Sequence, residues 1–488
     1  MLNHLPGVIL RFREEEVGMV GDISKMYHSI SISVSDQMTH CFLWRDLDLQ
    51  RNPDTYVITV VNFGNTPSAT IAMIALRKTA ELSQDDYPKA SKIILENSYM
   101  DDIADSIENE EKSVKVCNEI DEILKRGGFF TKGWILSALK GCLKDGNVER
   151  KEIRESLKVL GVGWENVDDK LFCEFKIYPK GRSMYVLNNS PVEELDETKT
   201  PNFTKRYLLS RINALYDPLG VSSPFTVRAK IMLRKLWTIE PKLNWDDPIP
   251  EGQKVEWEKF FEEAKKLKNV KFNRCLKPVD TIGDPTLVLF SDASKEAYGT
   301  VAYARWPMKD GKFEARLISS KCRVAPLKII DIVRLELAGA VLSKRMRVFL
   351  KKEMRYNFTE VYHLVDSEIV KAMVHKESYG FNTYVANRIG EIQEKTDPEE
   401  WMWIPGKLNI ADWVTRGKVY SELGEGSLWQ TGPKFLEKAV DEWPVVKEVM
   451  IQELPEQIKK FSVNIAQIDK MDGLAERIDI NRFSKSDC

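Results

Sequence analysis

The sequence has no Cys-x-x-Cys pair and only five histidines, which are dispersed along the chain. Its seven cysteines, at positions 41, 117, 142, 173, 275, 322 and 488, are scattered and odd in number. This pattern argues against a zinc knuckle or a His/Cys zinc domain, and it favours a reducing compartment.

Long apolar runs are absent as well, since none approaches the roughly 18 residues of a membrane span. Acidic residues interrupt the first twenty positions, where a signal peptide would be apolar. We therefore expect a protein that is not secreted, has no membrane partner and lies in the cytoplasm or the nucleus.

An excess of positive charge is also missing, because 72 Lys and Arg stand against 74 Asp and Glu, a net charge of -2. A simple polyanion binder would be basic overall, so any nucleic-acid surface must be local. The composition, 43% hydrophobic and 30% charged, is that of a folded protein. At about 150 residues per domain, 488 residues suggest roughly three domains.

The residue patterns predict a multidomain chain of the α/β and α+β classes. Strands and helices alternate over 1–135, a polar run at 188–202 indicates a linker or exposed loop, and 203–237 is helical with a break at 217–220. A helix near 251–268 is followed, from about 280, by three strands, helix, strand, helix, strand and a short helix, which predicts a compact mixed-sheet domain. We expect a charged helical tail over 426–488.

Three acids in the first part of the chain have the placement of metal ligands. Asp22 ends a short apolar strand, and Asp101 and Asp102 lie between two short strands that read as a hairpin. Adjacent carboxylates repel each other, and a hard cation such as Mg²⁺ relieves that repulsion while it bridges to phosphates. A solvated turn is the plain alternative.

Four more acids occupy suggestive places in the later domain. Asp292 ends its first strand, Glu336 lies in its long helix, Asp366 ends its fourth strand and Asp412 opens the last helix. Each has a structural alternative: Asx turns for Asp292 and Asp366, a lysine partner on the helix surface for Glu336, and the helix dipole for Asp412, three residues after a potential N-cap at Asn409.

Taken together, the order and the element types of these four acids resemble the ribonuclease H fold. That resemblance implies two Mg²⁺ (or Mn²⁺) ions in the active site, which activate a water and stabilise the departing 3′ oxygen. The implied substrate is the RNA strand of an RNA–DNA hybrid.

The first 165 residues resemble the reverse transcriptases of LTR retrotransposons in five ordered motifs. These are Asp22–Tyr27, Phe63–Ser68, Tyr99–Asp102, Gly128–Trp134 and Leu160–Trp164, the last similar to a primer grip. In the second motif, the usual Ser-Pro is replaced by Pro67-Ser68.

This second resemblance implies that Asp22 and Asp101 hold two catalytic metals with support from Asp102. It further implies that nucleotide and template contact Tyr27, Phe63, Gly64, Tyr99, Met100 and Lys132. The partners would be RNA, DNA and deoxynucleotides. Reverse transcriptases carry a fingers region before the first motif, and here only 21 residues precede Asp22. We therefore expect the ribonuclease H activity rather than the polymerase activity to be intact.

Further segments are similar to the BEL/Pao group of LTR retrotransposons. They are Phe42–Asp46, Thr204–Trp237, Ser320–Leu327, Arg334–Leu337, Val385–Arg388, Asn409–Asp412 and Trp429–Pro433. One departure is Val333, where the family more often has proline. The resemblance implies a truncated right-hand polymerase palm at 1–135, a helical thumb-and-connection region at 136–275, a ribonuclease H-like mixed-sheet domain at 276–425 and the tail at 426–488.

The region 201–240 carries seven basic residues against two acids. We expect a nucleic-acid backbone contact there rather than a neutral helix face, through Lys205, Arg206, Arg211, Arg228 and Lys230. The Tyr216–Gly220 stretch sits in a region often labelled a Pao-type peptidase, but the chain contains no Asp-Thr/Ser-Gly loop.

The sequence therefore predicts a reverse transcriptase and ribonuclease H fragment. A catalytically silent nucleic-acid-binding remnant is the competing hypothesis, and a peptidase is disfavoured. Oligomeric state is not predicted.

Overall fold

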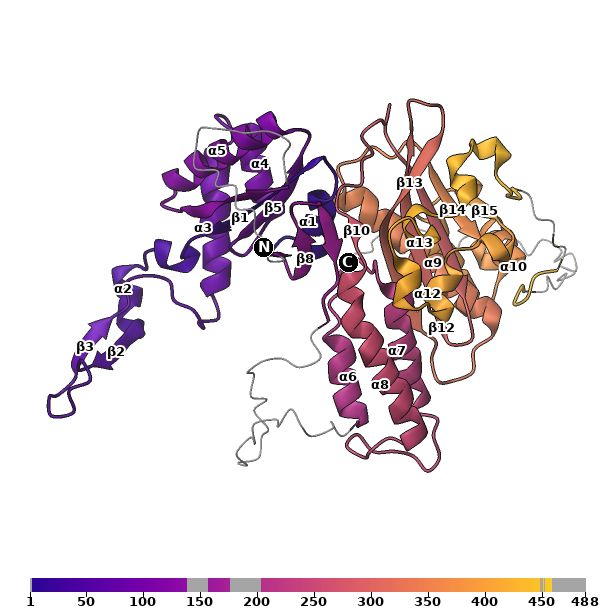
Figure 1. Cartoon of the computed structure of the whole chain (residues 1–488), viewed down its shortest axis with the longest axis horizontal. Coiled ribbons are helices and arrows are strands. Elements are labelled where there is room, and N and C mark those ends of the chain that lie inside the picture. Colours follow the sequence, from indigo (N-terminus) through magenta and orange to yellow (C-terminus); the bar gives the residue numbers. More distant parts are fainter. Residues whose placement is uncertain (1, 138–156, 176–202, 448–450, 452, 459–488) are drawn as a thin grey trace, which may run out of the picture.

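The computed structural model describes residues 2–137, 157–175, 203–447, 451 and 453–458 (Figure 1). The linker predicted at 188–202 and the end of the predicted tail, 459–488, lie outside these residues. Within the described part, no helix combines the length and apolar character needed to cross a membrane.

The first unit is a four-stranded antiparallel sheet with helices packed against it. Its strands, in spatial order, are β4 (Ser98–Tyr99), β5 (Asp102–Ile107), β1 (Val17–Ile23) and β6 (Thr131–Leu136). Helices α3 (Ser68–Leu82), α4 (Pro88–Asn97) and α5 (Glu110–Arg126) enclose an apolar core with it. Helix α5 begins where the Asn109 side chain accepts a hydrogen bond from Lys112 N, and acids in its first turn and bases in its last turn suit the helix dipole.

A hairpin projects from this unit at the far end of the molecule (Figure 1). It consists of β2 (Cys41–Trp44) and β3 (Asp54–Val57), preceded by the short helix α2 (Val34–Gln37). All four residues of β2 are exposed.

The middle of the chain forms a small sheet and three helices. The sheet order is β10 (Phe272–Asn273), β9 (Lys170–Phe172), β8 (Val162–Glu165) and β7 (Leu157–Val159). The β7–β8 turn has positive φ at both Leu160 (49°) and Gly161 (87°), which is the pattern of a two-residue hairpin turn. Helices α6 (Lys205–Asn213), α7 (Ser223–Lys235) and α8 (Glu251–Lys266) follow, and the predicted break at 217–220 separates α6 from α7.

The last unit is a five-stranded mixed sheet. Its order is β13 (Phe313–Val324), β12 (Ala297–Pro307), β11 (Thr286–Ala293), β14 (Val361–Val365) and β15 (Trp401–Trp403). The first three strands are antiparallel, and β14 and β15 run parallel to β11. Every residue of β11 is buried, because long helix α9 (Ile332–Glu353) covers one side of this central strand and α12 (Asp412–Arg416) also packs against it.

Two further helices, α10 (Glu368–Val374) and α11 (Thr383–Gln393), connect β14 to β15 and pack with α9 around a separate apolar cluster. This order of strands and helices is that of a ribonuclease H-like sheet, as predicted.

The predicted helical tail is wrong for residues 426–447. This segment forms only α13 (Leu428–Thr431) and two short 3₁₀ turns, and it packs against the mixed sheet. Trp429 and Leu436 are fully buried, and their carbonyl groups accept hydrogen bonds from Tyr303 Oη (2.8 Å) and Arg305 Nε (2.7 Å). Burial of apolar side chains fixes an irregular path here, which the charge pattern did not reveal.

The first helix, α1 (Leu5–Phe12), and the residues after it lie between the first sheet and the mixed sheet. Arg355, which follows α9, binds Glu14 (Nε to Oε2, 2.5 Å) and Asp105 of β5 (Nη2 to Oδ1, 2.6 Å). Arg11 pairs with Glu353 of α9 at 3.0 Å. The two sheets are therefore joined by ion pairs between residues in the first part of the chain and residues at the end of α9.

Candidate functional site

The topology of the mixed sheet brings Asp292 and Asp366 together. Strands β11 and β14 are parallel neighbours, and Ser291 is paired with Val365. The residues that follow this pair are Asp292 and Asp366, so both acids stand at the same end of adjacent strands. Asp292 is 6% exposed and accepts a hydrogen bond from Thr415 Oγ1. A hydrogen bond between the Asn409 side chain and Asp366 favours the charged form of this acid.

Helix α9 places Glu336 against the same end of the sheet. Ser367 Oγ donates a hydrogen bond to Glu336 Oε2 at 2.5 Å, and among the described residues no lysine forms the ion pair with Glu336 that was considered as an alternative. One turn later, a Cβ on Gly339 would stand 3.0 Å from the carbonyl oxygen of Asp292. The absence of a side chain at Gly339 lets the helix approach the strand that carries Asp292.

Asp412 is the first residue of α12 and is partly exposed. The N-cap of α12 is Ala411, so Asn409 is not the N-cap that its spacing allowed. Instead, Asn409 Nδ2 donates to the carbonyl oxygen of Ser291 at 2.9 Å, which ties the start of α12 to β11. Arg416, one turn further on, pairs with Asp412 Oδ1.

The four acids act on one another electrostatically. Burial, with the charges of Asp366 and Asp412, raises the pKa of Asp292 to about 6. Burial, with the charges of Asp366 and Asp292, raises the pKa of Glu336 to about 7. The pKa of Asp366 is raised by burial and by Asp412. The structure thus brings the four predicted residues into one carboxylate cluster, in which the charged forms of Asp292, Glu336 and Asp366 are disfavoured.

A second group of acids lies on the first sheet. Asp22 of β1 is directly opposite Asp102 of β5, and Ile23 N donates to the carbonyl oxygen of Asp101 at 2.8 Å. Strands β4 and β5 form the predicted hairpin, with Met100 at its turn in the left-handed region, φ 55°. Positive φ in a non-glycine residue is a strained conformation that often accompanies function.

Lys132 of β6 neutralises this second group in part. Its Nζ lies 2.8 Å from Asp22 Oδ1 and 2.9 Å from Oδ2. Burial, with the charges of Asp101 and Asp22, raises the pKa of Asp102 to about 6 even though Lys132 acts in the opposite direction. Lys132 therefore pairs with Asp22, one of the carboxylates that the resemblance assigned to a metal.

The predicted nucleotide-contact residues gather beside these acids. The rings of Tyr27 and Phe63 are 4.8 Å apart, and burial and the charge of Asp101 raise the pKa of Tyr27. Phe63 is 61% exposed, and Gly64 after it has φ 90°. Tyr99 is paired with Asp102 across the hairpin.

The predicted backbone-contact residues have partners within the chain. Lys205 is buried and donates to the carbonyl oxygen of Leu243, and Arg206 pairs with Asp246. Arg228 pairs with Glu263 at 2.5 Å. Lys230 Nζ lies 3.9 Å from Cys322 Sγ, and the Arg211 guanidinium lies 5.0 Å from the Tyr207 ring centre. Each of these cations thus has a partner within its own fold, although the Arg206 side chain is 60% exposed, and the nucleic-acid contact stays a prediction.

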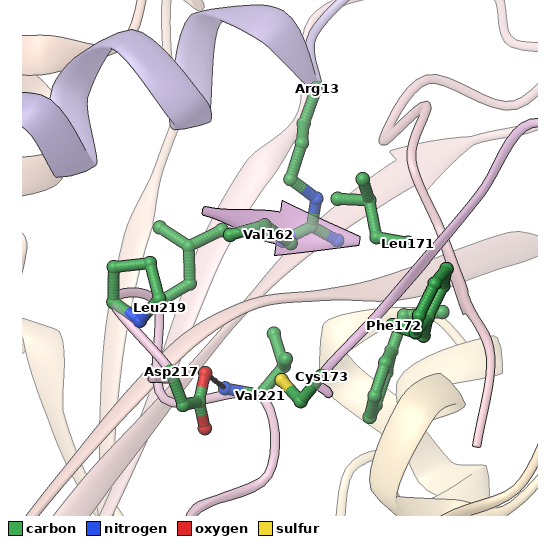
Figure 2. A pocket seen from close by; sticks show the side chains of 10 residues that line it. Arg13, Val162, Leu171, Phe172, Cys173, Asp217, Leu219 and Val221 are labelled. Atoms are coloured by element: carbon green, nitrogen blue, oxygen red, sulfur yellow. Dashed lines mark hydrogen bonds between the residues drawn. The ribbon is translucent and has the colours of Figure 1, made fainter. Parts of the chain in front are cut away.

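The 217–220 turn borders a small cavity of about 10 Å³, at the lower limit for one water molecule (Figure 2). Both oxygens of Asp217 accept backbone hydrogen bonds, from Val221 N (3.0 Å) and Ser222 N (2.7 Å). Burial, followed by the charge of Asp217, raises the pKa of the Cys173 thiol. The backbone thus holds the Asp217 carboxylate, and burial favours the thiol form of Cys173.

The chemistry of both acid groups suits a hard divalent cation, because all the donors are oxygens and their mutual repulsion raises pKa values. The side chains are not assembled for it, however: over the described ranges, no three His, Cys, Asp or Glu residues are grouped closely enough to hold a metal ion. Thr415, Ser367, Arg416 and Lys132 engage the acids instead.

Sequence reasoning missed three of these partners in the carboxylate cluster. Ser367 directly follows Asp366, and Arg416 stands four residues after Asp412, a spacing that predicts a contact on a helix. Those two could have been found from the sequence. Thr415 meets Asp292 across 123 positions of the chain, so only the tertiary structure identifies it.

Comparison with known families supports the BEL/Pao resemblance in one segment. Residues 204–367 match the family model of the Pao retrotransposon-like RNaseH-like domain. The match includes Asp292, Glu336 and Asp366, and it begins within the region predicted as a connection. No curated protein matches the chain.

Among solved structures, the chain is similar to three structures of a foamy viral protease-reverse transcriptase, each aligned over 83% of this chain. The complex with RNA/DNA hybrid has 15% identity, a TM-score of 0.45 and 46% of its length covered. The dRH form with dsDNA has 15% identity, a TM-score of 0.49 and 60% coverage. Another dsDNA complex has 14% identity, a TM-score of 0.47 and 70% coverage. The chain thus spans about half of the first structure.

Proposed function

We propose that the chain cleaves the RNA strand of RNA–DNA hybrids at the carboxylate cluster of the mixed sheet. The observation that carries this proposal is the convergence of Asp292, Glu336, Asp366 and Asp412 in one place, within a ribonuclease H-like sheet. Such a concentration of partly buried acids is costly to a fold, and a hydrolytic site is a reason to retain it.

The chain's own residues would orient the reacting groups. Thr415 and Asn409 hold Asp292 and Asp366 in place, and Gly339 lets α9 bring Glu336 to them. Glu336, with a pKa of about 7, can exchange a proton near neutral pH. Mg²⁺ or Mn²⁺ held by these acids, once Thr415, Ser367 and Arg416 had released them, would supply Lewis-acid activation of a water and stabilisation of the leaving 3′ oxygen.

The test is cleavage of a hybrid with labelled RNA in Mg²⁺ and in Mn²⁺. We expect hybrid-specific cleavage by the wild type, and at least a 100-fold loss in Asp292→Asn, because a ligand and charge are removed from the reacting centre (roughly the scale of one catalytic group). Asp284→Asn is the matched control, since Asp284 is exposed in the loop before β11. No cleavage by a folded wild type in either cation would instead favour a catalytically silent nucleic-acid-binding remnant.

A second candidate function is DNA synthesis at Asp22, Asp101 and Asp102. The cross-strand pair of Asp22 and Asp102 beside the Tyr27–Phe63 ring contact favours it. Extension of a primer on an RNA template with deoxynucleotides tests this function, with Asp102→Asn as the inactive comparison. Absence of extension with intact hybrid cleavage would leave the ribonuclease as the single activity.

A further inference from the structure

The segment 453–458 crosses the surface of the mixed-sheet unit next to α11. Leu454 is buried with residues of α9, α10 and α11. Backbone hydrogen bonds join Asn382 N to the carbonyl oxygen of Glu456 (2.9 Å) and Ile458 N to that of Gly380 (2.8 Å). We call residues 453–458 the strap.

The strap places one carboxylate on an arginine at the start of α9. Arg334 Nε and Nη2 donate hydrogen bonds to Glu456 Oε1 (2.5 Å) and Oε2 (2.8 Å), which makes a bidentate ion pair. Arginine forms the same bidentate interaction with a phosphate group. The guanidinium of Arg334 also lies 4.7 Å from the centre of the Tyr384 ring, and that of Arg388 lies 3.4 Å from it. Arg334 therefore holds the acid directly, and the Tyr384 ring lies against both Arg334 and a second guanidinium, that of Arg388.

Glu456 adopts an unfavourable backbone conformation to make this contact. Its φ is 61°, in the left-handed region that residues other than glycine seldom occupy. Such a strained conformation persists only where neighbouring residues impose it. Backbone strain at Glu456 therefore opposes its ion pair with Arg334. A competing anion can replace Glu456 more easily for that reason.

Arg334 is also close in sequence to the carboxylate cluster, two residues before Glu336. The two side chains leave different sides of α9, whose full width with side chains is about 10–12 Å. A nucleic acid bound at Glu336 that also extends across the width of α9 would therefore meet Arg334.

We propose that Arg334, Tyr384 and Arg388 form a binding site for a backbone phosphate of the nucleic acid, and that Glu456 of the strap occupies this site until the substrate displaces it. The strap is then an internal competitor, and its removal from Arg334 accompanies binding. This inference rests on the proposed function, because it takes the hybrid as the ligand.

The experiment measures the affinity of the full chain for a labelled RNA–DNA hybrid by fluorescence anisotropy in EDTA, so that no cleavage occurs. We expect Glu456→Gln to tighten binding about five-fold or more, the usual scale of coupling between two sites. The matched control, Glu453→Gln, removes the same charge from an exposed position of the strap and should leave affinity unchanged. Arg334→Gln should weaken binding.

The double variant Arg334→Gln, Glu456→Gln distinguishes competition from a general charge effect. If Glu456 acts through Arg334, its substitution no longer tightens binding once Arg334 is gone. Unchanged or weaker binding by folded Glu456→Gln, or unchanged binding by Arg334→Gln, would overturn the inference while the proposed function stands. Failure of the wild type to bind or cleave the hybrid would instead remove the proposed function itself.

Discussion

At the scale of single residues, the fold places the Asp292 carboxyl group where its ionised form is unfavourable. Its carboxylate is nearly inaccessible to solvent and lies within the influence of Asp366 and Asp412, while Thr415 provides a hydrogen bond. The folded state therefore binds a proton at Asp292 more tightly than the unfolded state does. This difference makes stability depend on pH and on cations.

A carboxyl group whose pKa is raised on folding destabilises the protein once it ionises. For Asp292, with a pKa raised from 3.8 to about 6, the unfolding free energy should fall as pH rises from about 4 to about 6 and stay low above that. In EDTA at pH 8, Asp292→Asn should be more stable than the wild type by on the order of 2 kcal/mol, a gain that disappears near pH 4. Urea denaturation at both pH values measures this.

Divalent cations should reverse this ranking. Mg²⁺ or Mn²⁺ at pH 8 should raise the unfolding temperature of the wild type and have little effect on Asp292→Asn, because a ligand is missing. Asp284→Asn should behave as the wild type does in every condition. Equal stability of the wild type and Asp292→Asn in EDTA would mean that the cluster carries no charge penalty.

At the scale of secondary-structure elements, the turn between α6 and α7 docks on the edge strand of the mixed sheet. Ser320 N donates to the carbonyl oxygen of Leu219 at 2.9 Å, and Ser319 Oγ donates to the same oxygen at 2.6 Å. Ser320 Oγ donates to the carbonyl oxygen of Gly220 at 2.5 Å. The turn covers backbone groups on β13 that an edge strand would leave unpaired.

Gly220 should tolerate no side chain in this turn. Its φ is 71°, and a Cβ there would overlap the carbonyl oxygen of Ser320. We expect Gly220→Ala to lower the unfolding free energy by about 3 kcal/mol, from the left-handed backbone and the collision together. Gly252→Ala in α8 is the control: a Cβ there meets nothing within 4 Å, and we expect a gain of up to about 1 kcal/mol. Similar midpoints of chemical denaturation for the two variants would contradict this account.

At the scale of the whole molecule, Arg355 joins the mixed sheet to the first sheet. Its two partners, Glu14 and Asp105, have side chains that are 1% and 0% exposed. Burial raises the pKa of Glu14 to about 7 although Arg355 favours its charged form. At this point of the junction two buried acids share one base, and both depend on it.

Arg355→Met should leave both acids buried without their cation, at a cost of about 3–5 kcal/mol. Arg206→Met removes an ion pair of the same kind with Asp246, but its partners are 60% and 69% exposed, and we expect a loss of less than about 1 kcal/mol. Urea midpoints, followed by tryptophan fluorescence, compare the two variants. A small effect of Arg355→Met would show that the two sheets are held together by apolar contacts instead.

The sequence by itself determined the elements of the mixed sheet and the acids that its ends carry. Alternating or continuous apolar runs and a long amphipathic helix are local properties that the sequence shows directly. The order of those elements resembles the ribonuclease H fold, and that resemblance implied the arrangement around Asp292 and Glu336. The hairpin of Tyr99 and Asp102 was predicted for the same reason.

Only the tertiary structure decided which partner each charge has. Thr415 reaches Asp292, Lys132 reaches Asp22 and Glu456 reaches Arg334 across more than a hundred positions. The intramolecular partners of the basic residues of 201–240 and the buried path of 426–447 could not be predicted from the sequence, since a charge count does not show what packs against a side chain. Secondary structure follows from the periodicity of residues close in sequence. Side-chain partners depend on contacts between distant residues, which exist only in the folded chain.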